Sequence, residues 1–176
     1  PRIGKLFLNA GPGYGGSCLP KDMKALIKFA KIAGVKPTLL NAVEDVNTKQ
    51  LEEVISIAKK KLGVLESKKI TILGTSFKPN TDDIRDSIAI ELIKQLLKRK
   101  VKVTVHDPKA IENTKNEFKK KINYAKSISD AILGSQCVII MTQWKQYEKL
   151  ANKLAGATID KTLRFSTKSK NTIRLI

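Results

Sequence analysis

The stretch that decides the fold is Lys69-Ile-Thr-Ile-Leu73, followed by the loop Gly74-Thr-Ser-Phe-Lys-Pro-Asn-Thr-Asp-Asp-Ile-Arg-Asp-Ser87. Its branched apolar residues predict a short buried β-strand. The loop leads into a helix predicted over 87–100, and a second strand is predicted over 101–105. A strand, a helix and another strand in this order are typical of a parallel βαβ unit with a right-handed crossover.

The same alternation continues toward the C-terminus. A helix is predicted over about 110–121, a short strand near 123–125, a short helix over 129–133 and a strand over 137–141. The whole pattern predicts an α/β fold with a Rossmann-like, doubly wound parallel sheet. Because ligands of such sheets bind at the carboxyl ends of the strands, we expect a binding site near residues 74–78, 106–107 and 142–144.

The residues before this sheet have a helical period instead. Apolar residues three and four positions apart predict helices over 20–33 and 37–62, and the period changes near Gly63–Ser67. We therefore expect two domains, a helical segment over 1–66 and the sheet over 67–176. Two amphipathic helices cannot bury their apolar stripes alone, so a second copy of the chain, in a homodimer, is the expected partner.

Composition limits the function classes. The net charge of +18, from 34 Lys and Arg against 16 Asp and Glu, favours attraction to anions. Most of the excess is lysine on helical faces and only 5% of residues are aromatic, so no specific nucleic-acid interface is expected. The sequence has no apolar run long enough for a membrane span and no leader pattern. Two distant cysteines favour a reducing, cytoplasmic location, and Cys137 is expected in the core.

A glycine-rich loop, Gly11-Pro-Gly-Tyr-Gly-Gly-Ser-Cys-Leu-Pro-Lys-Asp22, precedes the first predicted helix. Its glycines let backbone N–H groups approach an anion closely. Pro20 suits a first helical turn and Asp22 favours the helix dipole there, which places Cys18 at the helix N-terminus. That position, beside Lys21, favours the thiolate form of a cysteine. The alternative is a small buried cysteine beside a tight turn.

The loop after the first strand lacks the GxGxxG spacing of dinucleotide-binding folds, so this sheet is not expected to hold NAD in the usual way. It carries Lys78 and Arg85, which can hold a diphosphate together with the N-terminus of the next helix. A solvated polar loop is the alternative. His106, the only histidine, stays outside the predicted site, and Trp144 is expected to pack. No metal site is predicted.

Both loops have counterparts in one protein family. The string GPGYGGSCLPKD (11–22) resembles the active-site segment of the UDP-glucose/GDP-mannose 6-dehydrogenases, and GTSFKPNTDDIRDS (74–87) resembles a second motif of that family; the resemblance covers about residues 1–160 of the chain. The resemblance implies that Cys18 is a nucleophile that captures a sugar aldehyde as a thiohemiacetal. Oxidation to a thioester and hydrolysis follow, two hydrides pass to two NAD, and Asp22 helps to orient or activate water.

The resemblance also implies a UDP-sugar site. Arg2 matches an arginine that reaches the substrate of the neighbouring subunit, Lys78 a lysine on the diphosphate or sugar, and Arg85 an arginine near the phosphates of the NAD cofactor. The other implied substrate-binding residues are Phe7, Leu8, Asn9, Gly11, Tyr14, Gly15 and Phe77. Asn9 stands where several family members have lysine.

Departures from the family limit the expected activity. The GxGxxG-bearing NAD domain and the helix with the oxyanion-stabilising Lys and Asn are missing, and Ile159-Asp160 runs into Lys161-Thr-Leu-Arg164 where an Asp-Gly-Arg is usual. We expect the C-terminal part of an NAD-dependent UDP-glucose 6-dehydrogenase, inactive alone, whose N-terminal half is encoded separately, cleaved or omitted. The alternatives are a GDP-mannose 6-dehydrogenase fragment and a non-catalytic basic protein that binds nucleotides or nucleic acid.

Overall fold

The computed structural model describes residues 11–154, 164–165 and 172–174. Two helices come first, α1 (Leu19–Ile32) and α2 (Thr38–Leu62). Strands and helices then alternate: β1 (Lys69–Leu73), α3 (Ile88–Lys98), β2 (Lys102–His106), α4 (Ile111–Phe118), the 3-10 turn η1 (Lys119–Lys121), β3 (Asn123–Tyr124), α5 (Ile128–Ile132), β4 (Cys137–Ile140) and α6 (Lys145–Leu154). Two short strands complete the set, β5 (Arg164–Phe165) and β6 (Thr172–Arg174).

The strands form one sheet in the order β3-β2-β1-β4-β6-β5. Neighbours from β3 to β6 run parallel, and β5 is antiparallel to β6. Leu73, the last residue of β1, pairs with His106 on β2 and Ile140 on β4. Because these strands end level with one another, the loops after β1, β2 and β4 meet at one edge of the sheet.

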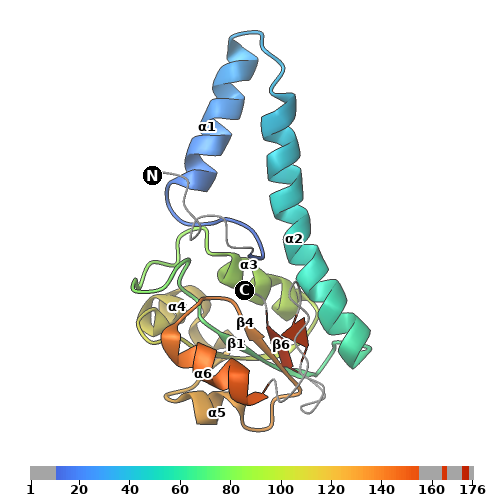
Figure 1. The fold of residues 1–176 in the computed structure, drawn as a ribbon, viewed down its shortest axis with the longest axis vertical. Helices are drawn as coiled ribbons and strands as arrows, with labels where there is room; N and C mark the ends of the chain where they lie inside the picture. The colour runs from blue at the N-terminus through green and yellow to red at the C-terminus, as the bar shows by residue number, and fades with distance from the viewer. Residues whose placement is uncertain (1–10, 155–163, 166–171, 175–176) are drawn as a thin grey trace.

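Helices cover both faces of the sheet (Figure 1). Ile70 and Ile72 of β1 point into a core shared with α2, α3 and α4. Leu73 points to the other face, where a second cluster includes Trp144 and Tyr147. Four of the five β1 residues are buried, as expected for a central parallel strand that is covered on both sides.

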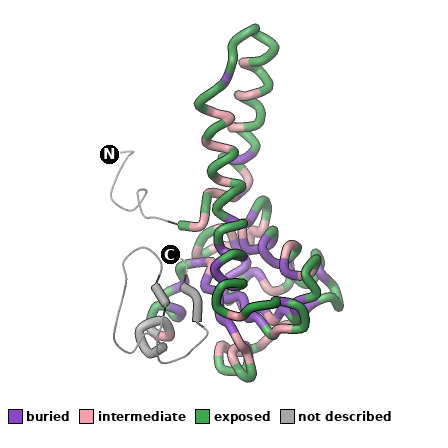
Figure 2. The backbone as a smooth tube through the Cα atoms, turned by 90° about the vertical axis from the view of Figure 1, so that its right-hand side faces the viewer, coloured by how far each residue is buried: buried purple, intermediate pink, exposed green. Residues whose placement is uncertain are grey.

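The two first helices form an arm that extends from the sheet domain (Figures 1 and 2). The second half of α2 is anchored, because Val54, Ile55 and Ala58 are buried in the core of the sheet domain. The far part of the arm is largely exposed in Figure 2. The arm therefore positions the loop before α1 relative to the sheet, while most of its own length meets solvent.

The predicted α/β fold with a doubly wound parallel sheet is confirmed. Each predicted strand agrees with an observed one to within one residue at each end. The helix predicted over 87–100 is shorter and ends at Lys98, because Lys100 has a φ of 57° and Val101 N bonds back to Leu96 O. Helix α6 and strands β5 and β6 were not predicted. The domain boundary near residue 66 stays a prediction, and the structure adds that α2 shares the sheet's core.

Candidate active site

Cys18 occupies the N-cap position of α1, at the helix N-terminus where the sequence predicts it. Pro20 is buried in the first turn, and Asp22 N donates to Cys18 O at 2.9 Å. The thiol is exposed, with Ser17 Oγ 3.7 Å from Cys18 Sγ. Cys18 is therefore not the small buried cysteine of the alternative interpretation. An exposed sulfur at a helix N-terminus is a suitable position for a nucleophile.

The loop that carries Cys18, residues 11–18, rests on the loop between β1 and α3. Gly16 N donates to Asp86 O at 3.3 Å. A Cβ at Gly15 would lie only 2.3 Å from Asp86 O, and one at Gly16 would lie 2.6 Å from the Phe77 ring. Glycine is thus needed at both positions for the backbones to approach this closely. The contact brings the two family-like motifs, residues 11–22 and 74–87, into one site.

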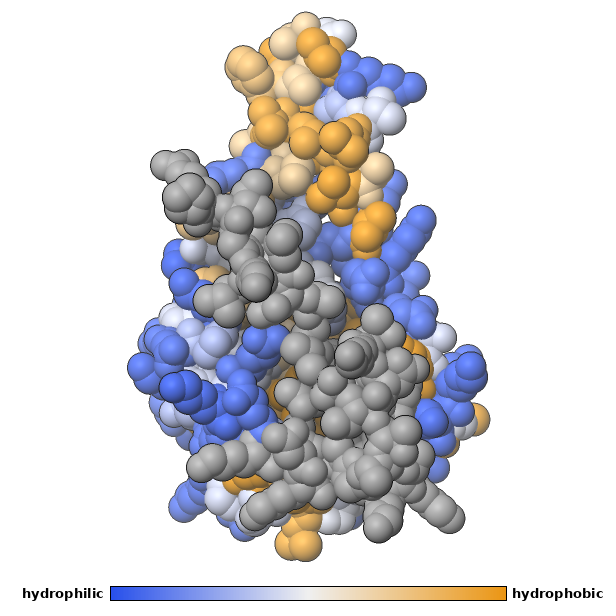
Figure 3. Space-filling model, in the orientation of Figure 1, coloured by the Kyte–Doolittle hydropathy of each residue, from blue (hydrophilic) through white to orange (hydrophobic). Residues whose placement is uncertain are grey.

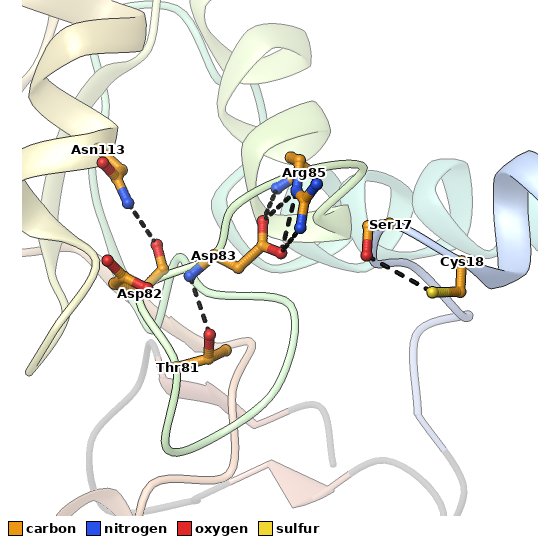
Figure 4. A network of polar contacts seen from close by, with 7 residues as sticks. All are labelled: Ser17, Cys18, Thr81, Asp82, Asp83, Arg85 and Asn113. Carbon is orange, nitrogen blue, oxygen red and sulfur yellow. Dashed lines mark hydrogen bonds and ion pairs between the residues drawn. The ribbon is translucent and has the colours of Figure 1, made fainter.

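Two cations lie close to the thiol. Arg85 binds Asp83 in a bidentate contact through one edge of its guanidinium, with Nε donating to Oδ1 at 3.0 Å and Nη2 to Oδ2 at 2.7 Å. This contact lowers the pKa of Asp83. The pKa of Arg85 is raised mainly by Asp83 and, to a smaller extent, by the charge of Cys18 as a thiolate. Figure 4 shows the Arg85 side chain between Asp83 and Ser17.

Lys21 is the second cation. It pairs with Asp22, which is the main cause of its raised pKa, and the Cys18 charge again contributes least among the factors that raise it. Lys21, Arg85 and the helix N-terminus thus place positive charge around Cys18. Because Lys21 pairs with Asp22 and Arg85 pairs with Asp83, both cations are held in place without a bound ligand.

The β1–α3 loop also presents Phe77 and Lys78. Phe77 N donates to Asp83 O at 3.1 Å, which closes the loop. Lys78 is exposed, and its Nζ lies 5.3 Å from the centroid of the Phe77 ring. The Phe77 ring thus lies against Gly16 on one side. It is also within the range of a cation–π contact with the Lys78 ammonium. An exposed ammonium and guanidinium on one loop suit a diphosphate.

Asp107, at the end of β2, shows whether the crevice of this sheet fits NAD. In dinucleotide-binding folds an acidic residue after β2 binds the ribose hydroxyl. Here Oδ2 accepts from Thr75 N at 2.7 Å and Ser76 N at 3.1 Å, while Oδ1 accepts from Lys109 N at 2.9 Å and Ala110 N at 2.8 Å. The carboxylate is buried and already paired. The crevice therefore does not fit a dinucleotide in the usual way.

Trp144 takes part in the same network. Its indole Nε1 donates to Asp107 Oδ2 at 3.3 Å, so the ring packs, as predicted, and also binds a buried carboxylate. His106 Nδ1 lies 2.7 Å from the hydroxyl of Tyr147, and the place of His106 outside the site stays a prediction.

A hollow of about 450 Å³ lies beside the nucleophile-bearing loop. It is bounded by the loop, the middle of α2 and the start of α3, with Tyr14, Glu44, Asn47, Arg85, Ser87 and Lys94 among its lining residues. The size is within the usual range for small-molecule sites. Tyr14, predicted to lie beside a sugar, faces α2 here, where its hydroxyl donates to Glu44.

Several predicted residues cannot be placed in this geometry. Arg2, Phe7, Leu8 and Asn9 lie outside the described residues, and Gly11 is exposed at the beginning of the described part. In the described part of the chain, no helix combines the length and apolar character needed to cross a membrane.

Sequence reasoning missed Asn47 and Glu44, and it named residues 106–107 only as part of an expected binding edge, without the role of Asp107 in joining the loops. The sequence position of Asn47 could have indicated its role. Asn47 lies four residues after Val43 and four before Leu51 on the apolar stripe of α2, where a polar side chain needs a hydrogen-bond partner. Asp107 follows a strand directly, at the edge where ligands bind, and this position also was a signal.

The fold and the site together define a class: a Rossmann-like α/β protein with an exposed cysteine at a helix N-terminus. Comparison with known sequences gives the family. The UDP binding domain of the UDP-glucose/GDP-mannose dehydrogenase family matches residues 71–171, and the central domain of the same family matches residues 1–49. The chain belongs to the UDP-glucose/GDP-mannose dehydrogenase family.

Individual relatives agree. The UDP-glucose 6-dehydrogenase AglM of Haloferax volcanii is 42% identical over 149 residues, which is 85% of this chain and 34% of the relative. The UDP-glucose 6-dehydrogenase YwqF of Bacillus subtilis is 39% identical over 143 residues, 81% of this chain and 32% of the relative. The chain thus spans about a third of the length of the curated relatives it matches.

A solved UDP-glucose dehydrogenase from Pyrobaculum islandicum superposes with a TM-score of 0.82 at 33% identity, over 98% of this chain and 40% of that one. A GDP-mannose dehydrogenase from Pseudomonas aeruginosa, at 23% identity and a TM-score of 0.77, covers 89% of this chain and 37% of that one and shows the shared fold.

Proposed function

We propose that this chain supplies the nucleophile and the UDP-sugar-binding part of a UDP-glucose 6-dehydrogenase. The observation that carries the proposal is the contact between the two motifs: Gly15 and Gly16, next to Cys18, lie against Asp86 and Phe77 of the β1–α3 loop. An exposed thiol and two diphosphate-compatible cations, Lys78 and Arg85, therefore belong to one surface.

The proposed chemistry follows from this arrangement. The Cys18 thiolate attacks the aldehyde carbon at C6 of the sugar, and the carbonyl oxygen takes up a proton, giving a thiohemiacetal. Covalent capture keeps the aldehyde from leaving between two oxidations. After oxidation to the thioester, water attacks the carbonyl carbon and releases the Cys18 thiolate. We assign Asp22, one helical turn after Cys18, to orienting that water.

Binding is assigned to the two loops. Lys78 and Arg85 hold the diphosphate region of the ligands, Lys78 on the UDP-sugar and Arg85 near the phosphates of NAD. We assign Phe77, Tyr14, Gly11 and Gly15 to the sugar and, from the family resemblance alone, Arg2, Phe7, Leu8 and Asn9 to UDP-sugar binding. Hydride transfer is the chemistry that NAD supplies. Because the Asp107 carboxylate is buried and already paired with backbone N–H groups, we propose that NAD binding and turnover need residues beyond those of this chain.

The test is calorimetric titration of the purified chain with UDP-glucose, UDP, GDP-mannose and ATP. The proposal predicts a preference for the uridine nucleotides. Equal affinities for all four ligands would contradict it, and a preference for GDP-mannose would assign the chain to the other branch of the family. Turnover of UDP-glucose with NAD by the isolated chain would refute the proposed need for further residues.

The charge of +18 favours a second candidate, a basic binding protein without chemistry. Binding of single-stranded or duplex DNA that persists at physiological salt and is unchanged by Cys18→Ser would support it. Steep loss of binding with salt would mark unspecific attraction to polyanions.

We also propose that the arm binds a second copy of the chain. Its exposed large apolar residues form a patch visible in Figure 3, made up of Leu26, Phe29, Ile32, Val35, Leu39 and Val46. Phe29 is 68% exposed and Ile32 75%, which is costly in water for a single chain. Sedimentation should show a dimer that Phe29→Asp converts to a monomer; a monomer at all concentrations would point to another partner, such as a separate N-terminal half.

A further inference from the structure

Asn47, in the middle of α2, binds the loop that carries Cys18. Its Oδ1 accepts from Tyr14 N at 2.8 Å, and its Nδ2 donates to Tyr14 O at 3.1 Å. One amide side chain thus pairs with both backbone polar groups of one loop residue. Loop residues have no regular partners for these groups, so this contact takes the place of a secondary-structure ladder.

The loop is shaped to allow the contact. Gly13 has a φ of 122°, and a Cβ there would lie 2.5 Å from Asn47 Oδ1. One turn earlier on α2, Glu44 accepts a hydrogen bond from the Tyr14 hydroxyl. Burial, followed by the hydrogen bond and charge of Glu44, raises the pKa of Tyr14 to about 12. Backbone and side chain of Tyr14 are therefore both held by the same face of α2.

Helix α2 is a rigid support for this contact. Leu51 and Val54, one and two turns after Asn47, are buried in the core of the sheet domain. Asparagine has a low helix propensity, so its presence in the interior of a long helix is unfavourable by itself. Its side chain here makes two hydrogen bonds to another element, which offset that cost.

We propose that Asn47 is a positioning residue that fixes the loop of residues 11–18 on α2, so that Cys18 keeps one place relative to the β1–α3 loop. The proposal rests on the proposed function, because the loop matters as the carrier of the nucleophile. Tyr14 is four residues before Cys18, and Gly16 between them is already seated on Asp86 and Phe77. Without the hydrogen bonds between Asn47 and Tyr14, the loop loses one of its attachments. Ligand binding must then restore the lost order.

The experiment compares Asn47→Ala, Asn47→Asp and Asn41→Ala in the full chain. Aspartate keeps the acceptor for Tyr14 N but cannot donate to Tyr14 O. Asn41 lies on the same helix and makes no side-chain hydrogen bond to any described residue, so it is the matched control. Hydrogen exchange of the loop amides reports, without a ligand, on the pair of hydrogen bonds between Asn47 and Tyr14, here called the clamp. Calorimetry with UDP-glucose reports the effect of the clamp on binding.

For Asn47→Ala we expect the Tyr14 amide to exchange roughly tenfold to a hundredfold faster and UDP-glucose to bind roughly tenfold more weakly. Amides in β1 and α3 should keep their exchange rates, Asn47→Asp should be intermediate, and Asn41→Ala should match the unaltered chain. Unchanged loop exchange in Asn47→Ala, an equal effect of Asn41→Ala, or faster exchange throughout the sheet would each overturn the proposal. If exchange behaves as expected but the unaltered chain binds no UDP-glucose, the clamp stands and the proposed function fails.

Discussion

Gly15→Ala tests whether the close contact of the two loops creates the binding surface. The new Cβ would lie 2.3 Å from Asp86 O, whereas a carbon–oxygen contact is comfortable at about 3.3 Å. The loops must therefore separate by about 1 Å. The colliding atom is a backbone oxygen, so no change of rotamer relieves the overlap. Overpacking of this kind costs about 1–3 kcal/mol.

Because the cost arises where the two parts of the site meet, it should appear in ligand affinity. Calorimetry should show UDP-glucose binding roughly tenfold to a hundredfold weaker in Gly15→Ala. Gly34→Ala is the control: Gly34 has a φ of 73° and nothing within 4 Å of a Cβ, so alanine there strains the end of α1, at a cost of about 1 kcal/mol, without touching the site. Affinity in Gly15→Ala within about twofold of the unaltered chain would show that the close contact of the two loops does not create the binding surface.

Three further substitutions or conditions have defined outcomes. Cys18→Ser should keep the affinity for UDP-glucose within about twofold of the unaltered chain, because the exposed thiol supports no other element. A loss of affinity above about tenfold in calorimetry would contradict this. Asp107→Ala should lower the free energy of unfolding in urea by about 3 kcal/mol, because buried N–H groups of Thr75, Ser76 and Ala110 lose their acceptor; a loss below about 1 kcal/mol would show that water replaces the carboxylate. Burial is the main cause of the lowered pKa of His106, so the unfolded chain binds more protons than the folded chain below pH about 6.5. The free energy of unfolding should therefore fall as the pH drops from about 7 toward 5.5. His106→Asn, which removes the only histidine, should flatten this dependence on pH. The same dependence in both proteins would assign it to other groups.

The sequence predicts the sheet well because its signals are local. The run Ile70-Thr-Ile-Leu73 is apolar and branched, and such a run between a lysine pair and a glycine forms a buried strand almost regardless of context. The position of Cys18 is also predictable, since Pro20 and Asp22 mark the first helical turn. Both features depend on neighbours in the chain.

Other features depend on residues distant in the sequence. The clamp joins Tyr14 to Asn47, which are 33 residues apart, and the Asp107 network joins loops after three different strands. Only the tertiary fold decides which partner each polar group meets. Helix α6 was missed because its pattern is mostly polar, with Tyr147 supplying the buried contact. The need for glycine at Gly15 likewise comes from Asp86, a residue of another loop.

If Cys18 is the thiol of a UDP-sugar site, a bound UDP-sugar must protect it from alkylation. Cys18 is exposed and Cys137 is buried, so iodoacetamide should alkylate Cys18 selectively, as peptide mass spectrometry can follow. UDP-glucose should slow alkylation of Cys18 in a saturable manner, and ATP at the same concentration should do so much less. An alkylation rate that UDP-glucose leaves unchanged, at concentrations where calorimetry shows it bound, would place Cys18 outside the UDP-sugar site.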